Sequence, residues 1–150
     1  MEAAFSTEKP SWQRTLEACG LLAIGTGAPC PVPAVLTAIH AVTGVEVRPT
    51  AAIAESHADV MAELDRQWLA NTSTLPLVSG AGKLLIVPPG PGGSAAGWVL
   101  VKDSVGTGLP SRVAGATGSP ELLALSVDGR YLCAVTSEED EFWIVTRVLI

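Results

Sequence analysis

The chain has 150 residues, of which 48% are hydrophobic and only 16% are charged, and its formal net charge at pH 7 is −6. A chain of this length fits one domain that buries a core without support from a metal or a disulfide. Its nine Lys and Arg residues are scattered singly, so binding to nucleic acid or to an anionic membrane surface is not expected.

The first half of the chain is predicted to be mainly helical. Residues 1–10 are expected to form a loose tail. Apolar residues at helical spacing predict one helix over 11–24 and another over 52–70. Between them, Pro33 suits the first turn of a second helix, and Gly44 suits its end.

From residue 75 onward the apolar pattern becomes that of β-strands. A short alternating strand is also predicted at 45–48, before the third helix. Asp128-Gly129 predicts a two-residue hairpin turn, because this pair tolerates positive φ at both positions. The glycine-rich segment 103–120 is expected to be a long connection. The five main strand-like runs cover residues 83–88, 98–102, 122–127, 131–136 and 142–150.

The order of these elements predicts an α+β fold: about three N-terminal helices packed on a C-terminal antiparallel sheet of about five strands, in a single domain over residues 1–150. Several strands are apolar on both faces, whereas a half-solvated strand alternates apolar and polar residues. Five strands make a sheet roughly 24 Å wide, and one helix covers about 10 Å of that width. Three helices are therefore too few to cover both faces.

The uncovered face has three possible covers: a second subunit, a bound ligand, or the sheet itself closed into a barrel. A two-fold homodimer is favoured, because cyclic dimers are the commonest assemblies and Trp is enriched at interfaces. A ligand pocket floored by the tryptophan rings is the rival interpretation. The predicted interface residues are Trp98, Trp143, Val145 and Leu149.

The cysteines and the N-terminus indicate the compartment. Cys19, Cys30 and Cys133 are odd in number and form no Cys-x-x-Cys pair, which is typical of a reducing environment. The N-terminus has acidic residues and no apolar run of a signal peptide, and no stretch approaches the ~20 apolar residues of a membrane helix. We therefore expect a cytoplasmic protein that spans no membrane.

Reactive side chains are few, and none lies in a known motif. Cys30 precedes a predicted helix, whose N-terminus would lower the pKa of the thiol, with His40 or His57 as a candidate base. The same residues together with Cys19 match no zinc-ligand spacing, so no metal is expected. Gly80–Lys83 resembles part of a phosphate loop but leads into a strand, so no nucleotide or other cofactor is expected.

Three functions fit this pattern. The first is a non-catalytic interaction or regulatory protein, of the adaptor or toxin-neutralising type, that acts as a homodimer and docks a basic partner at Glu138, Glu139 and Asp140. The second is a small-molecule-binding domain with an apolar pocket between sheet and helices and with glycine-rich loops as lids. The third is a small enzyme that depends on Cys30, or on an acid such as Glu46 or Asp103.

Overall fold

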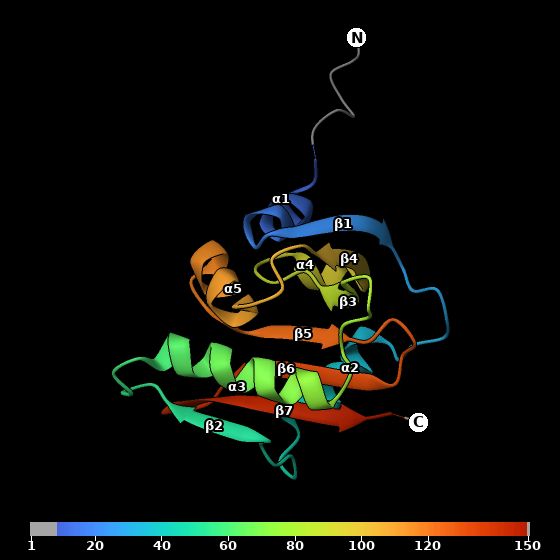
Figure 1. Ribbon diagram of the computed structural model, residues 1–150. Coiled ribbons are helices and arrows are strands. Elements are labelled where there is room, and N and C mark those ends of the chain that lie inside the picture. Colours follow the sequence, from blue (N-terminus) through green and yellow to red (C-terminus); the bar gives the residue numbers. More distant parts are fainter. Residues whose placement is uncertain (1–8, 150) are drawn as a thin grey trace.

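The computed structural model describes residues 9–149, which form one seven-stranded sheet in the order β1-β4-β3-β5-β6-β7-β2 (Figure 1). All neighbouring strands are antiparallel. Since β1 and β2 are the two edges, the sheet is open and the closed-barrel alternative is wrong. The strands are β1 (Leu21–Thr26), β2 (Ala51–Ala54), β3 (Lys83–Val87), β4 (Val99–Asp103), β5 (Leu122–Leu125), β6 (Tyr131–Ser137) and β7 (Glu141–Val148).

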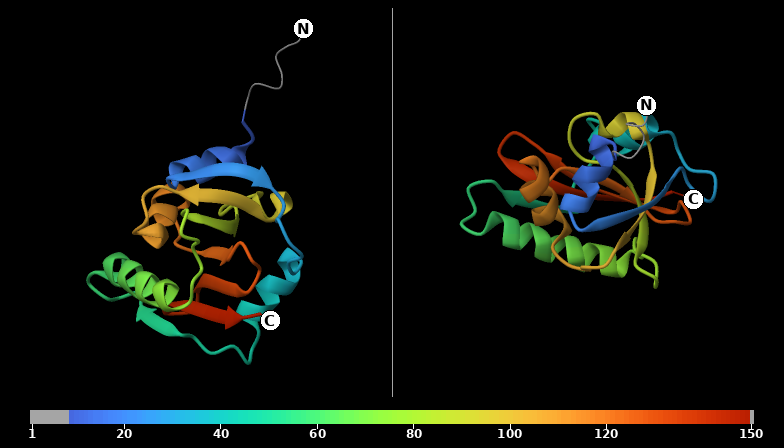
Figure 2. Two further views of the ribbon diagram at one scale, coloured as in Figure 1. Left: turned by 45° about the vertical axis from the view of Figure 1, so that its right-hand side comes forward. Right: turned by 90° about the horizontal axis from the view of Figure 1, so that it is seen from above.

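Helices pack on both faces of this sheet (Figure 2). One face carries α1, α3 and α5, and the other carries α2 (Figure 2). The short helix α4 borders the α2 face through Ser94, whereas its Ala96 packs against the core of the first face. The fold is therefore α+β with an antiparallel sheet, as predicted, although the helices are interspersed among the strands. The helices are α1 (Ser11–Ala18), α2 (Val35–Thr43), α3 (Val60–Thr74), α4 (Gly93–Ala96) and α5 (Leu109–Thr117).

The central strands are buried on both faces. In β3, Leu84 and Ile86 enter the core beneath α1, α3 and α5, whereas Leu85 and Val87 enter the core beneath α2. This follows from the alternation of side chains along a strand. The described chain has five helices instead of about three, and Val32 in the segment before α2 packs on the second face as well, so most of both faces is covered.

Both edge strands lie where the sequence predicted other structure. The predicted helix over 11–24 ends at Ala18, because Gly20 adopts φ +80° and the chain turns back into β1. The strand predicted at 45–48 is absent from the described chain, and β2 forms instead at 51–54, inside the predicted third helix. Its alanines favour a helix on their own, and only pairing with β7 makes them a strand.

Two connections also differ from their predictions. The segment 103–120 contains α5, whose Leu109 and Val113 are buried although glycines surround them. The Asp128-Gly129 turn is longer than two residues, since the N–H of Ser126 donates to the carbonyl of Tyr131 at 2.9 Å across residues 127–130. The predicted loose tail over 1–10 lies almost wholly outside the described residues.

A largely buried ion pair holds one end of the sheet together. The Arg112 guanidinium on α5 donates to the Asp103 carboxylate at 2.8 Å, to the Cys19 carbonyl at 2.7 Å and to the Thr107 carbonyl at 3.0 Å. Only 17% of the Arg112 side chain and 8% of the Asp103 side chain are exposed. The pair thereby connects α5, the end of β4 and the turn between α1 and β1.

Removal of this pair tests how much the contact stabilises the fold. Arg112→Met leaves a buried carboxylate without its cation, so the free energy of unfolding in urea should fall by about 3 kcal/mol. Arg66→Met is the matched control: Arg66 pairs with Glu63 on the surface of α3, with 66% of its side chain exposed, and its loss should cost below about 1 kcal/mol. Equal effects of the two substitutions would contradict a structural role for Arg112.

Candidate functional site: an apolar groove beside α2

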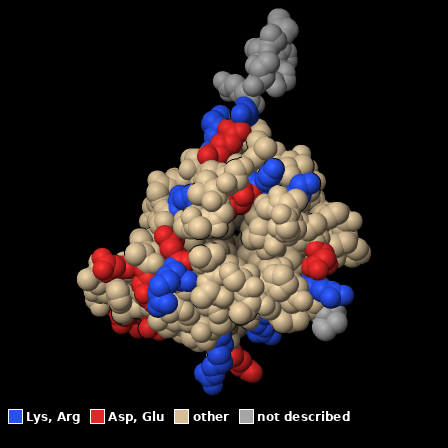
Figure 3. Space-filling view, viewed as in Figure 1, with Lys and Arg blue, Asp and Glu red and all other residues tan. Residues whose placement is uncertain are grey.

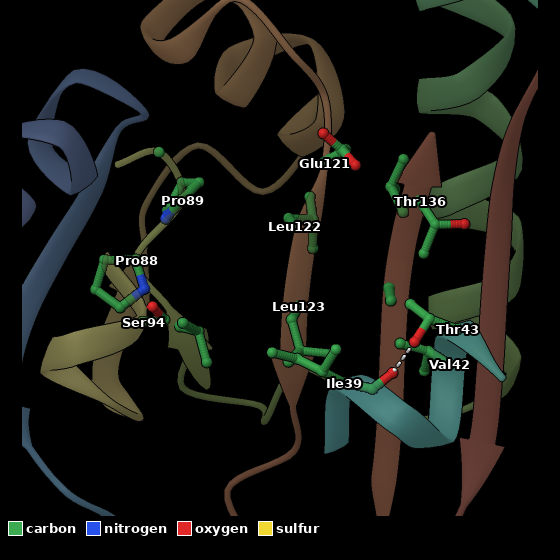
Figure 4. Close-up of a pocket in the computed structure, with 14 residues that line it drawn as sticks. Ile39, Val42, Thr43, Pro88, Pro89, Ser94, Glu121, Leu122, Leu123 and Thr136 are labelled. Carbon is green, nitrogen blue, oxygen red and sulfur yellow. Dashed lines mark hydrogen bonds between the residues drawn. The ribbon is translucent and has the colours of Figure 1, made fainter. Parts of the chain in front are cut away.

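The candidate site is a groove on the α2 face of the sheet, with a volume of about 260 Å³ (Figure 4). Its floor is formed by Val87, Leu123 and Ala134, which lie on the central strands. Val87 and Leu123 keep 8% and 9% of their surface exposed, unlike the fully buried Leu85 and Leu125 on the same face. The covering layer is therefore incomplete at this place.

Helix α2 forms one wall. Ala38 and Val42 point into the core and fix the helix on the sheet, which leaves Ile39 partly buried at the groove. The approach to α2 is held by the Trp98 indole, whose Nε1 donates to the carbonyl of Pro33 at 2.9 Å. Thr43 stands at the exposed end of this wall, and its hydroxyl donates to the carbonyl of Ile39 at 2.7 Å.

The opposite wall is the segment from Pro88 to α4. Pro88 and Pro89 are buried, and their rings fix the backbone as it leaves β3. Gly93 packs so closely on this backbone that a Cβ at its position would lie 1.6 Å from the Pro88 carbonyl oxygen. Only glycine fits there. The wall is thus a packed turn and a short helix.

Few polar groups line the groove. Thr43, Ser94 and Thr136 bring hydroxyl groups, and Glu121 brings the one charged side chain among the lining residues. The Thr136 hydroxyl donates to the Glu138 carboxylate at 2.9 Å. No lining residue is Cys, His or Lys, so the groove offers neither a thiol nor an imidazole base.

The predicted catalytic residues lie elsewhere. Cys30 is half-buried, and its thiol donates to the carbonyl of Val127 at 3.3 Å. His40 is exposed on α2, and exposed His57 accepts the N–H of Asp59 through Nδ1 at 3.0 Å. Among residues 9–149 no hydrogen bond joins Cys30 to either histidine.

The predicted interface residues fall into two groups. Trp98, which is 6% exposed, and Val145, which is fully buried, belong to the core beneath α2. Trp143 and Leu149 are only partly buried against that core, and the Trp143 Nε1 donates to Glu141 at 2.6 Å. A second copy cannot touch Trp98 or Val145 unless the covering segments move. Contact through Trp143 and Leu149 stays a prediction.

The acidic turn between β6 and β7 lies beside the groove. Glu138, Glu139 and Asp140 form this turn, which is closed by the N–H of Glu138 donating to the carbonyl of Glu141 at 2.8 Å. The N–H of Glu55 at the end of β2 donates to the carbonyl of Asp140 at 2.9 Å. Figure 3 shows acidic side chains gathered at the lower left, where β2 ends and α3 begins. This end of the molecule is negative.

A second hollow, of about 460 Å³, lies on the other face between α3 and two glycine-rich turns. Trp68 and Leu109 give it apolar surface, and Thr72 and Ser79 give it hydroxyl groups. Asp103 also lines it, but its carboxylate is paired with Arg112. This hollow was not predicted from sequence, because the segment that contains α5 was predicted to be an irregular connection.

No group of three or more His, Cys, Asp and Glu side chains in the described part of the chain is placed to hold a metal ion. None of the helices within residues 9–149 is long and apolar enough to cross a membrane. No family model, no curated protein and no solved structure matches the chain. The groove therefore has to be interpreted from its own geometry.

The three thiols differ sharply in their surroundings, which predicts selective reactivity. Burial raises the pKa of Cys133 to about 12 and also raises the pKa of Cys19, although Arg112 opposes the shift there. Because the thiolate is the reactive form, Cys30 should react with iodoacetamide at pH 8 at least about tenfold faster than the other two. Peptide mass mapping measures the three rates, and unfolding in guanidinium should make them similar. Fast alkylation of Cys133 in the folded chain would contradict its burial.

Proposed function

We propose that this chain is a non-catalytic interaction protein that binds an apolar segment of a partner protein in the groove beside α2. One observation carries the proposal: a hollow with an apolar floor, in which Val87 and Leu123 keep 8% and 9% of their surface exposed, lies between two packed walls, and no thiol or imidazole lines it. Exposed apolar surface with a polar rim is typical of protein-interaction sites. Rigid walls favour binding further, because little freedom is lost when the partner docks.

The size of the groove favours a peptide over a small molecule. About 260 Å³ lies below the roughly 300–1,000 Å³ of most small-molecule sites, which enclose their ligands. The rim residues Thr43, Gly90, Ser94 and Glu121 are exposed, so the groove is open along its top. A peptide can lay a few apolar side chains on such a floor while its backbone stays near the surface.

Binding of a small molecule is the second candidate function. It is favoured by the hollow beneath α3, whose volume of about 460 Å³ falls within the usual range for such sites. Its mixed lining of indole, leucine and hydroxyl groups suits a ligand with both apolar and polar parts. The two candidates are separable, because the two hollows lie on opposite faces of the sheet.

Self-association is supported at the edge strand β1. Leu22 and Ile24 are 57% and 47% exposed, and the strand has no charged residue and no proline. An uncharged edge is a template for pairing with another strand. Antiparallel pairing of β1 with β1 of a second copy has two-fold symmetry and would continue the sheet across the dimer. This contact differs from the one expected around Trp143 and Leu149.

The dimer proposal can be tested by mass. Light scattering on a size-exclusion column should give about twice the chain mass of 15.4 kDa for the parent protein, and 15.4 kDa for Leu22→Lys, because a lysine on the edge opposes strand pairing. Leu36→Lys, at a 64% exposed position on α2, is the matched control and should stay dimeric. A parent protein that elutes as a single chain at high concentration would rule the dimer out.

The groove proposal can be tested with a random library of 12-residue peptides panned on the folded chain. Enriched peptides should carry apolar residues, and their affinity should fall at least about tenfold when Thr43→Trp or Ser94→Trp fills the groove. Thr37→Trp is the matched control, because Thr37 is an exposed threonine of α2 that does not line the groove. Fluorescence titration of each enriched peptide gives the dissociation constants.

The outcomes of this selection separate the two candidate functions. Failure to enrich any peptide, or equal binding to all three tryptophan variants, would overturn the groove proposal. The neutral dye Nile red provides the parallel measurement for small molecules. Dye fluorescence that is unchanged in Thr43→Trp but lost in Ser79→Trp would point to the hollow beneath α3 instead.

A further inference from the structure

We infer that the partner segment carries a lysine or arginine next to its apolar residues, and that this cation sits at the end of the groove formed by Glu121 and Thr136. The inference rests on the proposed function and specifies the chemistry of the partner. It is argued from the distribution of charge around the groove.

The two strands of the floor place this end of the groove. Leu122 of β5 pairs with Val135 of β6, which sets Glu121 next to Thr136 where both strands reach the rim. Figure 4 shows Glu121 and Thr136 together at one end, beyond the apolar side chains of Leu123 and Ile39. The space beside Glu121 thus lies at the end of the apolar floor.

A second carboxylate extends this end. Thr136 donates its hydroxyl to the Glu138 carboxylate at 2.9 Å, which holds the Glu138 carboxylate against Thr136. Glu121 accepts the hydroxyl of Ser119 at 3.1 Å, a contact that leaves room for further donors on a carboxylate. Two anionic groups therefore flank one hydroxyl at the rim.

Neither carboxylate has a cationic partner within the described chain. The ion pairs among residues 9–149 use the carboxylates of Glu17, Glu63 and Asp103. The other lining residues of the groove are apolar or carry only hydroxyl groups. A bound cation consequently has one anionic location to occupy, and the net charge of −6 favours a cationic partner at longer range as well.

The occupant we commit to is a peptide segment, since the open groove suits a chain that enters and leaves it along the rim. Its apolar residues lie on Val87, Leu123 and Ala134, and its ammonium or guanidinium group lies between Glu121 and Glu138. A small amphiphile with a quaternary ammonium group has similar chemistry. Binding of such an amphiphile in place of a peptide would contradict the proposed occupant.

The experiment uses the peptides enriched on the folded chain. Their lysine or arginine residues are replaced by glutamine, and affinities are measured by calorimetry at low and at high salt. The cationic peptide should bind about fivefold tighter than its glutamine version at low salt, and the difference should shrink at high salt. In a Glu121→Gln, Glu138→Gln variant the two peptides should bind equally.

The matched control is Glu139→Gln, Asp140→Asn, which removes the same number of charges at two exposed positions of the acidic turn that do not line the groove. This control should keep the preference for the cationic peptide. Loss of the preference in both double variants would show a general effect of net charge and overturn the proposed location.

The remaining outcomes separate this inference from the proposed function. Enriched peptides without lysine or arginine, or a glutamine version that binds as tightly as the parent peptide, would overturn the cation site and leave the groove proposal standing. No enriched peptide at all would overturn the groove proposal itself. If dodecyltrimethylammonium binds through Glu121 and no peptide does, the peptide proposal is wrong and the occupant is a small amphiphile.

Discussion

Burial of both faces of the central strands is the constraint on which the rest of the structure depends. Strands β3, β5 and β6 carry apolar side chains on each side, so the chain must supply two covering layers. Three helices provide one layer. The other layer has α2 and the segment leading into it, with α4 only at its border, and it is thinner. The groove lies where this thinner layer ends, so the same constraint that stabilises the sheet also creates the candidate site.

Much of the sheet could be predicted from the sequence. The five C-terminal strands appear as apolar runs, because strands buried on both faces lose their polar residues. The edge strands could not be predicted in this way. Ala51–Ala54 and Leu21–Thr26 have compositions that suit a helix, and long-range pairing with β7 and β4 decides their conformation. Helix α5 was not predicted either, because the glycines in and around it are typical of a loop.

The candidate site was predictable only in part. The two-sided apolar pattern indicated that one face of the sheet would be incompletely covered, and the acidic turn at Glu138 was recognised from its charges. The opening itself depends on the contact of Gly93 with Pro88 and on the packing of Ala38 and Val42 of α2 against the sheet. Neither is encoded in a local pattern. Trp98 illustrates the limit, since its ring indicated an exposed aromatic surface but serves to anchor the segment before α2.

The sheet order has a further consequence for how the chain acquires this structure. Residues 21–26 hydrogen-bond to residues 99–103, and residues 51–54 hydrogen-bond to residues 141–144. Each edge strand therefore pairs with a strand more than seventy residues later in the chain. Pairing of this kind is slow, because closing such a long loop costs conformational entropy. During synthesis the early segments must wait for distant strands that do not yet exist. Their exposed leucines and alanines make that interval the time at which the nascent chain is most prone to aggregate.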